Sequence, residues 1–538
     1  MILSMKTKYM LATGLIGSMM LSSCYEDKGN YDYSEIEKIE ITLPEGLMVM
    51  ANSESIIFDP VITSSFAGVI DGQNENYEFN CKINYRHTDP ETGQYLYWLD
   101  INPEKKKDIN FFAGIPSGNY PIWYSVTNKE TGFTANAKGM VSVLTSTYEG
   151  WMVLSNEGVE KSARLDIISK DSKCNPMVAT NLLGTNSPDI KNATQLSLFA
   201  SMYAGREAIS LLSESGGYRL DIEKLTTSEN NNVKLTDFIV PTVPGEPVSY
   251  LVVTGEGAYY GPTSNFCVTT EGNAYAIRSG NAGSSFEDPM NTTTPGGEPT
   301  YKVSPMTGTS MVRPGNSTCV LCYDVTNKRF VGWNYNSTPN NLMFTLTDPE
   351  GADRKFSYQT GMELIDMEST RFSNGLVYSV LQDAQGKRSI YGINLAGSRF
   401  TQEVIYNDIT AEHFNDATDY VFHSQFPFMF YSYSNKVYSY NLGSGAITQV
   451  LELPAGETVT KLKFNLYVNP QLGMLNGMNP SQEFLDRQFD LIVASTTGEE
   501  NGGIVRFYDI DNSGNMSQLE EYKGFGDHIV DVTYRERR

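Results

Sequence analysis

Residues 428–441 read FMFYSYSNKVYSYN, and this stretch decides the fold. Two runs rich in Phe and Tyr flank the polar turn Ser434-Asn435. Aromatic residues favour β-strands, and a short polar turn joins antiparallel neighbours. The stretch therefore predicts a β-hairpin.

The same pattern of two strands around a polar turn occurs seven times after residue 147. The predicted strand pairs are 151–154 with 163–168, 208–212 with 218–222, 266–269 with 274–277, 318–323 with 329–333, 376–381 with 389–393, 428–433 with 436–441, and 489–494 with 504–509. Their starting points lie 57, 58, 52, 58, 52 and 61 residues apart. A repeat of about 40–50 residues with four strands per unit is typical of a β-propeller, and the longer spacing indicates loop insertions.

We therefore predict an all-β chain in which residues 147–538 form a β-propeller. Seven blades are favoured over six or eight, and a pair of β-sandwiches is the alternative. Sheets arranged radially leave no long edge exposed. The final stretch, residues 527–534, is expected to add a strand to a terminal blade and latch the ring.

Residues 35–146 carry a different pattern of short alternating strands separated by Gly, Pro, Asn and Asp. Six or seven strands in this length predict an Ig-like β-sandwich. The stretch Gly118 to Asn128, GNYPIWYSVTN, resembles the closing strands of PKD domains, although the Trp-Asp-Phe-Gly-Asp-Gly signature of that family is missing. The resemblance implies a PKD-like domain that acts as a spacer.

Residues 1–23 have the features of a signal peptide. Lys6 and Lys8 precede an apolar stretch at 9–20, which is too short to span a membrane. The following Leu21-Ser22-Ser23-Cys24 resembles the lipobox of bacterial lipoproteins, which implies that Cys24 is lipidated. An ordinary signal peptide that happens to contain Cys is the alternative.

Residues 24–34 form the predicted tether. Glu26 and Asp27 resemble the signal that exports lipoproteins of Bacteroidetes to the outer face of the outer membrane. A polar tether without export information is the alternative. We expect a lipid-anchored protein of the outer membrane that faces the outside.

The net charge argues against one class of partner, and the cysteine content argues against disulfide bonds. Lys plus Arg number 40 against 63 Asp plus Glu, a net charge of −23, which opposes binding to nucleic acid. Five cysteines remain besides Cys24, and an odd number of scattered cysteines does not form a disulfide framework. Cys319 and Cys322 share C-x-x-C spacing, but they lie in an apolar strand and are expected in the core.

One string has the spacing of a calcium loop. Asp509, Asp511 and Ser513 precede Gly514, and Glu520 occupies the twelfth position. The flanking residues have strand patterns, and the same residue types form tight turns. A turn without metal is the favoured interpretation, and no cofactor is required.

Signatures of catalysis are missing from the sequence. It contains no His-Glu-x-x-His, no Gly-x-Ser-x-Gly and only four histidines, of which His413 and His423 are expected at the surface. With 63 acids, some carboxylate pair is always available, so its presence is no evidence for a glycosidase. We therefore expect a protein that is not an enzyme.

Binding is the function that remains, at loops on the propeller rim. Aromatic side chains there can stack on sugars or peptide groups. The candidates are Tyr259, Tyr260, Trp333 and Tyr335, and packing within a blade is the favoured alternative for each.

Together, the string from Cys24 to Tyr33, the PKD-like sandwich and the propeller resemble the PKD-like lipoproteins of gut Bacteroidetes. That resemblance implies partnership with SusC/SusD-type, TonB-dependent uptake systems and capture of a glycan or a peptide. A structural subunit of the transporter and an unrecognised hydrolase are the alternatives.

Overall fold

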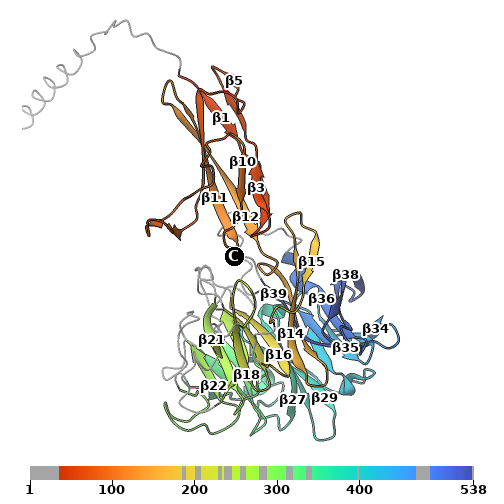
Figure 1. The fold of residues 1–538 in the computed structure, drawn as a ribbon. Coiled ribbons are helices and arrows are strands. Elements are labelled where there is room, and N and C mark those ends of the chain that lie inside the picture. The colour runs from red at the N-terminus through yellow and green to blue at the C-terminus, as the bar shows by residue number, and fades with distance from the viewer. Residues whose placement is uncertain are drawn as a thin grey trace, which may run out of the picture. The chain divides into compact units, whose positions relative to one another are not determined.

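The computed structural model describes residues 36–184, 189–199, 208–227, 233–234, 245–254, 262–277, 288–310, 319–334, 342–396, 399–467 and 485–535. These residues fall into two compact units (Figure 1). Unit 1 holds the residues up to Glu45, Ile57–Phe111 and Pro121–Gly139, and unit 2 holds Gly46–Ile56, Phe112–Tyr120 and the residues from Met140 onward. Both units are built from β-strands, which confirms the all-β prediction.

The N-terminal sandwich has one five-stranded sheet and two smaller ones. The large sheet has the order β2 (Leu47–Met50), β12 (Thr134–Leu144), β11 (Gly118–Asn128), β6 (Tyr77–Ile83) and β9 (Leu99–Asp100); the others are β1 (Ile39–Thr42), β4 (Val61–Ser64) and β5 (Gly68–Val69), and β10 (Ile109–Phe112) with β3 (Ser55–Phe58). A separate hairpin pairs β7 (His87–Thr88) with β8 (Tyr95–Leu96). Alternate residues of β6 and β11, such as Phe79 and Tyr124, are fully buried, as the period of a strand requires.

The described residues of the second unit form seven antiparallel sheets in chain order. They are β13 (Gly150–Glu157), β14 (Ser162–Lys170) and β15 (Pro176–Ala179) with β39 (His528–Arg535); β16 (Ala193–Phe199), β17 (Ala208–Ser213), β18 (Gly216–Leu220) and β19 (Val233–Lys234); β20 (Pro247–Thr254), β21 (Pro262–Thr269) and β22 (Ala274–Ile277); β23 (Gly308–Thr309), β24 (Cys319–Asp324), β25 (Arg329–Asn334) and β26 (Phe344–Thr345); β27 (Glu363–Ser369), β28 (Leu376–Gln382), β29 (Arg388–Asn394) and β30 (Thr401–Tyr406); β31 (Asp419–Phe422), β32 (Phe428–Tyr433), β33 (Lys436–Asn441) and β34 (Ile447–Glu452); and β35 (Thr458–Phe464), β36 (Leu491–Thr496), β37 (Gly503–Ile510) and β38 (Met516–Phe525). Each of the seven predicted hairpins pairs within one sheet. Six of them form the two middle strands of a four-stranded sheet, and β21 with β22 forms one side of the three-stranded sheet. The seven-bladed propeller is thus confirmed.

The C-terminal strand closes the propeller. β39 pairs antiparallel with β13, and Val532 lies opposite Val153. It also contacts β16 of the next sheet and β35 of the last one. In Figure 1 the end of the chain therefore returns to its first propeller strands, which confirms the predicted latch.

Apolar side chains fill the space between neighbouring sheets. Leu154 and Leu165 of the first sheet pack with Leu196 and Ile209 of the second. Trp151 of the first sheet packs with Phe507 of the last. The first sheet therefore buries both faces, and such packing between neighbouring sheets stabilises a propeller. Cys319 and Cys322 are buried free thiols within β24, as predicted.

Candidate functional site

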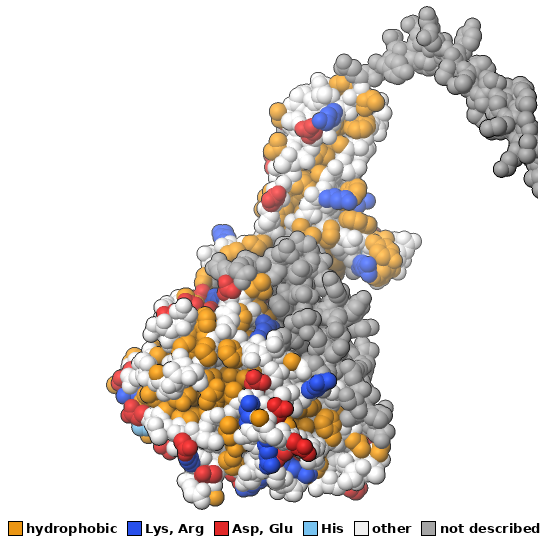
Figure 2. Space-filling view, turned by 180° about the vertical axis from the view of Figure 1, so that it is seen from behind, with side chains coloured by type: hydrophobic (Ala, Val, Ile, Leu, Met, Phe, Trp, Pro, Cys, Tyr) orange, Lys and Arg blue, Asp and Glu red, His pale blue; other side chains and the backbone are white. Residues whose placement is uncertain are grey.

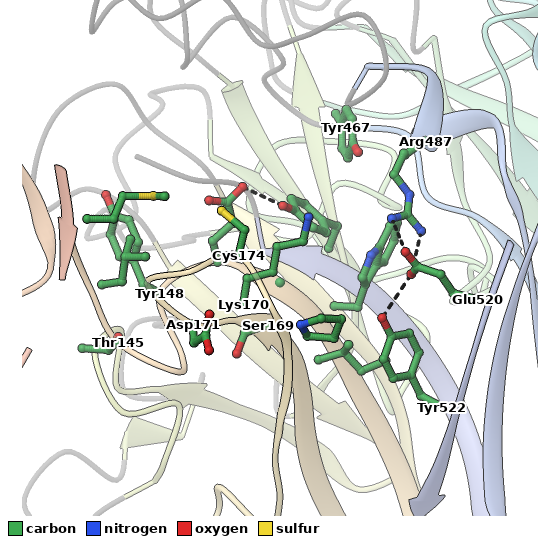
Figure 3. Close-up of a pocket in the computed structure, with 18 residues that line it drawn as sticks. Thr145, Tyr148, Ser169, Lys170, Asp171, Cys174, Tyr467, Arg487, Glu520 and Tyr522 are labelled. Carbon is green, nitrogen blue, oxygen red and sulfur yellow. Dashed lines mark hydrogen bonds and ion pairs between the residues drawn. The ribbon is translucent and has the colours of Figure 1, made fainter. Parts of the chain in front are cut away.

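A cavity of about 200 Å³ lies where the first and last propeller sheets meet (Figure 3). We call it the closure pocket. Its lining includes Trp151 from β13, Lys170 from β14, Glu520 and Tyr522 from β38, and Tyr534 from β39. Glu520 and Tyr522 are two residues apart on one strand, so both side chains point to the same face. The pocket lies where the latch brings the two ends of the propeller together, and Met48 and Leu144 also line it.

Aromatic rings form one side of the closure pocket. The ring centroid of Trp151 lies 4.9 Å from that of Phe507 and 4.8 Å from that of Tyr534. Tyr534 in turn lies 5.5 Å from Tyr467, which follows β35. Edge-to-face and tilted contacts of this kind stabilise an aromatic cluster and fix the orientation of its rings.

A half-buried ion pair lies against these rings. Arg487, in the 3-10 turn Arg487–Phe489, contacts both carboxylate oxygens of Glu520 at 3.2 Å and Asp490 at 3.3 Å. Its guanidinium lies 5.2 Å from the ring centroid of Phe507 and 5.9 Å from that of Trp151. Burial opposes the charge of Arg487, but hydrogen bonds and charges of Glu520 and Asp490 outweigh it and raise its pKa.

Two tyrosine hydroxyls complete the polar lining. The Tyr522 hydroxyl donates to Glu520 at 3.2 Å, and the Tyr534 hydroxyl donates to Glu149 at 2.6 Å. Burial raises the pKa of Tyr522 to about 12, and burial with the Glu149 charge raises that of Tyr534 further. Both phenols therefore stay neutral at physiological pH. The pocket offers aromatic faces, fixed charges and hydroxyls around a space that fits one ring-sized group.

A second cavity, of about 740 Å³, is lined by first strands of several propeller sheets. We call it the inner cavity. Lys461 contacts Asp419 at 2.8 Å, and Lys463 contacts Asp531 at 2.5 Å. Asp366 and Glu368, both on β27, also line it.

Burial raises the pKa of Asp366 to about 7 and that of Glu368 to about 8. Lys461 opposes both shifts, while the charge of Asp419 adds to them. The folded propeller thus holds protons on these two carboxyls at pH values where an unfolded chain would release them.

This proton binding makes stability depend on pH. The pKa values of Asp366 and Glu368 are higher in the folded protein than in the unfolded chain. The stability that their protonation contributes is therefore complete below about pH 4 and is lost as the pH rises towards about 8. We expect the double variant Asp366→Asn/Glu368→Gln to be more stable than the wild type at pH 9 by on the order of 1–3 kcal/mol, because one pKa unit corresponds to about 1.4 kcal/mol. Thermal unfolding between pH 5 and 9 measures this difference.

The matched control for this experiment is Glu363→Gln, which changes an exposed acid on the same strand. Its stability difference from the wild type should stay constant over the pH range. A double variant that loses stability at pH 9 would contradict the assignment.

Of the predicted ligand-contacting aromatics, the structure describes Trp333. Trp333 is fully buried in the core, with its ring centroid 6.1 Å from that of Phe266, so the structure supports the packing interpretation. Tyr259, Tyr260 and Tyr335 lie outside the described residues. Cys24, Glu26 and Asp27 also lie outside them.

The calcium-like string forms a hairpin turn. The Asp511 carboxylate accepts the backbone N–H groups of Ser513 at 2.8 Å and Asn515 at 2.9 Å. Asp509 lies on β37, while Glu520 lies on β38 and is held by Arg487. The string therefore forms a tight turn between β37 and β38. Within the residues it describes, no three His, Cys, Asp or Glu side chains form a group that could hold a metal ion.

The prediction that His423 lies at the surface is wrong. His423 is buried, and burial lowers its pKa to about 4. Its Nδ1 accepts the backbone N–H groups of Gln425 and Phe426, each at 3.0 Å, so it shapes a turn. His413 is half-buried and stacks on Tyr433 with centroids 3.9 Å apart.

The sequence analysis missed the residues of the closure pocket. Trp151 stood in a predicted strand, but nothing in its neighbourhood indicates that it meets Tyr534, at the other end of the propeller. Arg487 has no strand or helix pattern around it. The one available signal was the predicted latch, which requires residues near both ends to be neighbours.

The described part of the chain has no helix that is long and apolar enough to cross a membrane.

Comparison with known families supports the PKD-like resemblance. The family model described as the PKD-like family matches residues 24–188, which include the sandwich and the first propeller strands. No curated protein matches the chain in sequence.

Several solved structures resemble the chain in shape. A quinonprotein alcohol dehydrogenase-like protein from Bacteroides thetaiotaomicron is 11% identical, with a TM-score of 0.41, over 90% of this chain and 96% of that one. A DUF4784 family protein from Bacteroides caccae is 9% identical, with a TM-score of 0.33, over 78% and 96%. The extracellular domain of a putative one component system from B. thetaiotaomicron is 9% identical, with a TM-score of 0.33, over 89% and 66%. At these scores, the assignment of the fold rests on the strand pairing of the chain itself.

Proposed function

We propose that this chain is a lipid-anchored protein of the outer cell surface that captures a glycan without cleaving it. Lipidation at Cys24 and export directed by Glu26 and Asp27 are parts of this proposal that the sequence supports. The proposed partner is a SusC/SusD-like transporter, which would receive the captured ligand.

The closure pocket is the observation that carries the proposal. Sugar rings have apolar faces that stack on aromatic side chains and hydroxyls that hydrogen-bond to charged and polar groups. Tyr522 and Tyr534 supply phenols, and Arg487 with Glu520 supplies charged partners within one small cavity. The volume of about 200 Å³ suits one sugar residue, held at the end or at a branch of a longer chain.

The arrangement favours binding over catalysis. Both carboxylate oxygens of Glu520 are engaged by Arg487, and one also accepts the Tyr522 hydroxyl. A carboxylate held in this way is positioned to accept hydrogen bonds from sugar hydroxyls. Hydrolysis of a glycosidic bond requires two carboxyl groups placed on either side of that bond. Glu149 and Asp171 also line the pocket, but Glu149 accepts the Tyr534 hydroxyl at 2.6 Å.

The proposal predicts that Glu520→Gln weakens glycan binding by about ten- to hundredfold. Hydrogen bonds to charged groups contribute about 1.5–3 kcal/mol each, and the substitution removes the charge while keeping the shape. Pull-down on insoluble polysaccharides and calorimetric titration with oligosaccharides measure the effect. The matched control is Leu519→Ala, because Leu519 is exposed at the neighbouring position of the same strand.

Two outcomes would contradict the proposal. If the chain binds peptides from digested protein and no glycan, the ligand is a peptide and not a glycan. Co-purification with the transporter, with no binding of either ligand, would favour a structural subunit.

A further inference from the structure

We propose that Trp98 and Trp123 form a second carbohydrate-binding site, on the outer face of the five-stranded sheet in unit 1. This site goes beyond the proposed function, which places capture in the propeller and leaves the sandwich as a spacer.

Both tryptophans are exposed, and Trp123 occupies a strand position at which a polar residue would be permitted. On β11, Ile122, Tyr124 and Val126 point into the core, whereas Trp123 and Ser125 point to the opposite face. Trp123 is 36% exposed and Trp98 is 39% exposed. The remaining tryptophans of the chain, Trp151 and Trp333, are buried. Large apolar groups exposed together on a polar face mark binding sites more often than isolated ones do.

A groove of about 450 Å³ accompanies the pair. It is lined by the two tryptophans, Asn80, Lys82 and Ser125. Ser125 lies directly opposite Asn80, and Trp123 lies directly opposite Lys82 on the neighbouring strand. The two indole rings have centroids 6.4 Å apart and an interplanar angle of 71°, so they form an angled aromatic surface.

Polar groups surround the rings on both sides. The Trp123 indole N–H donates to Asn136 at 3.0 Å, and the Lys138 ammonium lies 5.2 Å from the ring centroid. In Figure 2, hydrophobic side chains of the sandwich stand next to Lys and Arg side chains. A purely apolar partner would strip water from these amide and ammonium groups without replacing their hydrogen bonds. A sugar offers both an apolar ring face and hydroxyls, and it therefore fits this surface.

Strand addition by a peptide does not suit the groove. β11 and β6 lie inside the sheet, so their backbone hydrogen bonds are already made with β12, with each other and with β9. A peptide adds to a sheet at a free edge. Recognition at this face must use side chains, and the side chains present are two indoles with amide, hydroxyl and ammonium groups.

The test uses the full chain in affinity electrophoresis through gels that contain soluble polysaccharides, followed by titration of tryptophan fluorescence with the oligosaccharide that retards it. We expect Trp123→Ala and Trp98→Ala each to weaken retardation by at least about tenfold, as central aromatic contacts do. Trp123→Phe should restore most of the binding. Phe66→Ala is the matched control, because Phe66 is 51% exposed and follows β4 of another sheet.

The design separates this site from the closure pocket. Glu520→Gln should leave the binding that depends on Trp98 and Trp123 unchanged, and the two alanine variants should leave binding in the propeller unchanged. Retardation that is equal in the wild type and both alanine variants, with unchanged thermal unfolding, would overturn the inference. Retardation of no polysaccharide, or loss of peptide binding only, would also overturn it.

Discussion

A chain that ends at Gly526 is expected to lose the cooperative unfolding of the propeller. The truncation removes β39, in which Ile529 and Val532 are fully buried against Trp151 and Phe507. Emptying one buried aliphatic site costs about 2–5 kcal/mol, and a whole strand also takes its hydrogen bonds with β13. Such a loss approaches the total stability of a typical domain, about 5–15 kcal/mol.

Differential scanning calorimetry and limited proteolysis measure this result. The double variant Ile529→Ala/Val532→Ala gives a graded version in the full chain and should lower the unfolding midpoint clearly. His528→Ala is the control, since His528 is exposed on the same strand. A truncated chain with the midpoint of the full chain would show that the latch does not close the propeller.

Replacing Arg506 with Met is expected to destabilise the propeller by about 3–5 kcal/mol. Arg506 is buried on β37, where it contacts Glu457 at 2.9 Å and Glu521 at 2.7 Å and also donates to the Ser495 hydroxyl at 2.9 Å. Burial opposes its charge, but the hydrogen bonds and charges of the two glutamates outweigh it and raise its pKa. Removing one member of a buried ion pair leaves an uncompensated charge, and this causes most of the cost.

A second substitution tests that reason directly. Arg506→Met/Glu457→Leu should recover much of the stability, because it removes the charge left unpaired. The exposed pair of Lys523 and Glu521 provides the contrast, and Lys523→Ala should change stability by less than about 1 kcal/mol. Equal losses for Arg506→Met and the double variant, measured by thermal unfolding, would contradict the explanation.

The repeat of strand hairpins was predictable because it is a local property. In residues 428–441, both strands and the turn can be identified from residue type alone, and β32 and β33 have the predicted bounds. Which faces are buried was not predictable in the propeller. β25 is buried along almost its whole length, so alternation does not tell a core Trp333 from an exposed one.

The sandwich behaves differently, because one face of its large sheet meets solvent. There the sequence pattern predicts that Trp123 points away from the core, because apolar and outward-facing residues alternate along Ile122, Trp123, Tyr124 and Ser125. The partner ring, Trp98, lies in a loop whose path depends on tertiary contacts. The closure pocket likewise joins residues from opposite ends of the propeller. The predicted latch was the one feature of the sequence that indicated that these residues are neighbours.

The most direct test of non-catalytic glycan capture measures affinity and chemical fate together. The full chain is titrated with end-labelled oligosaccharides in a calorimeter. The same mixtures are then incubated for a long time, and the masses of the oligosaccharides are measured by mass spectrometry. The account predicts saturable binding of one class of oligosaccharide, weakened by Glu520→Gln, with every molecule recovered at its original mass. Recovery of shorter products, or heats of mixing that never saturate across the panel, would contradict it.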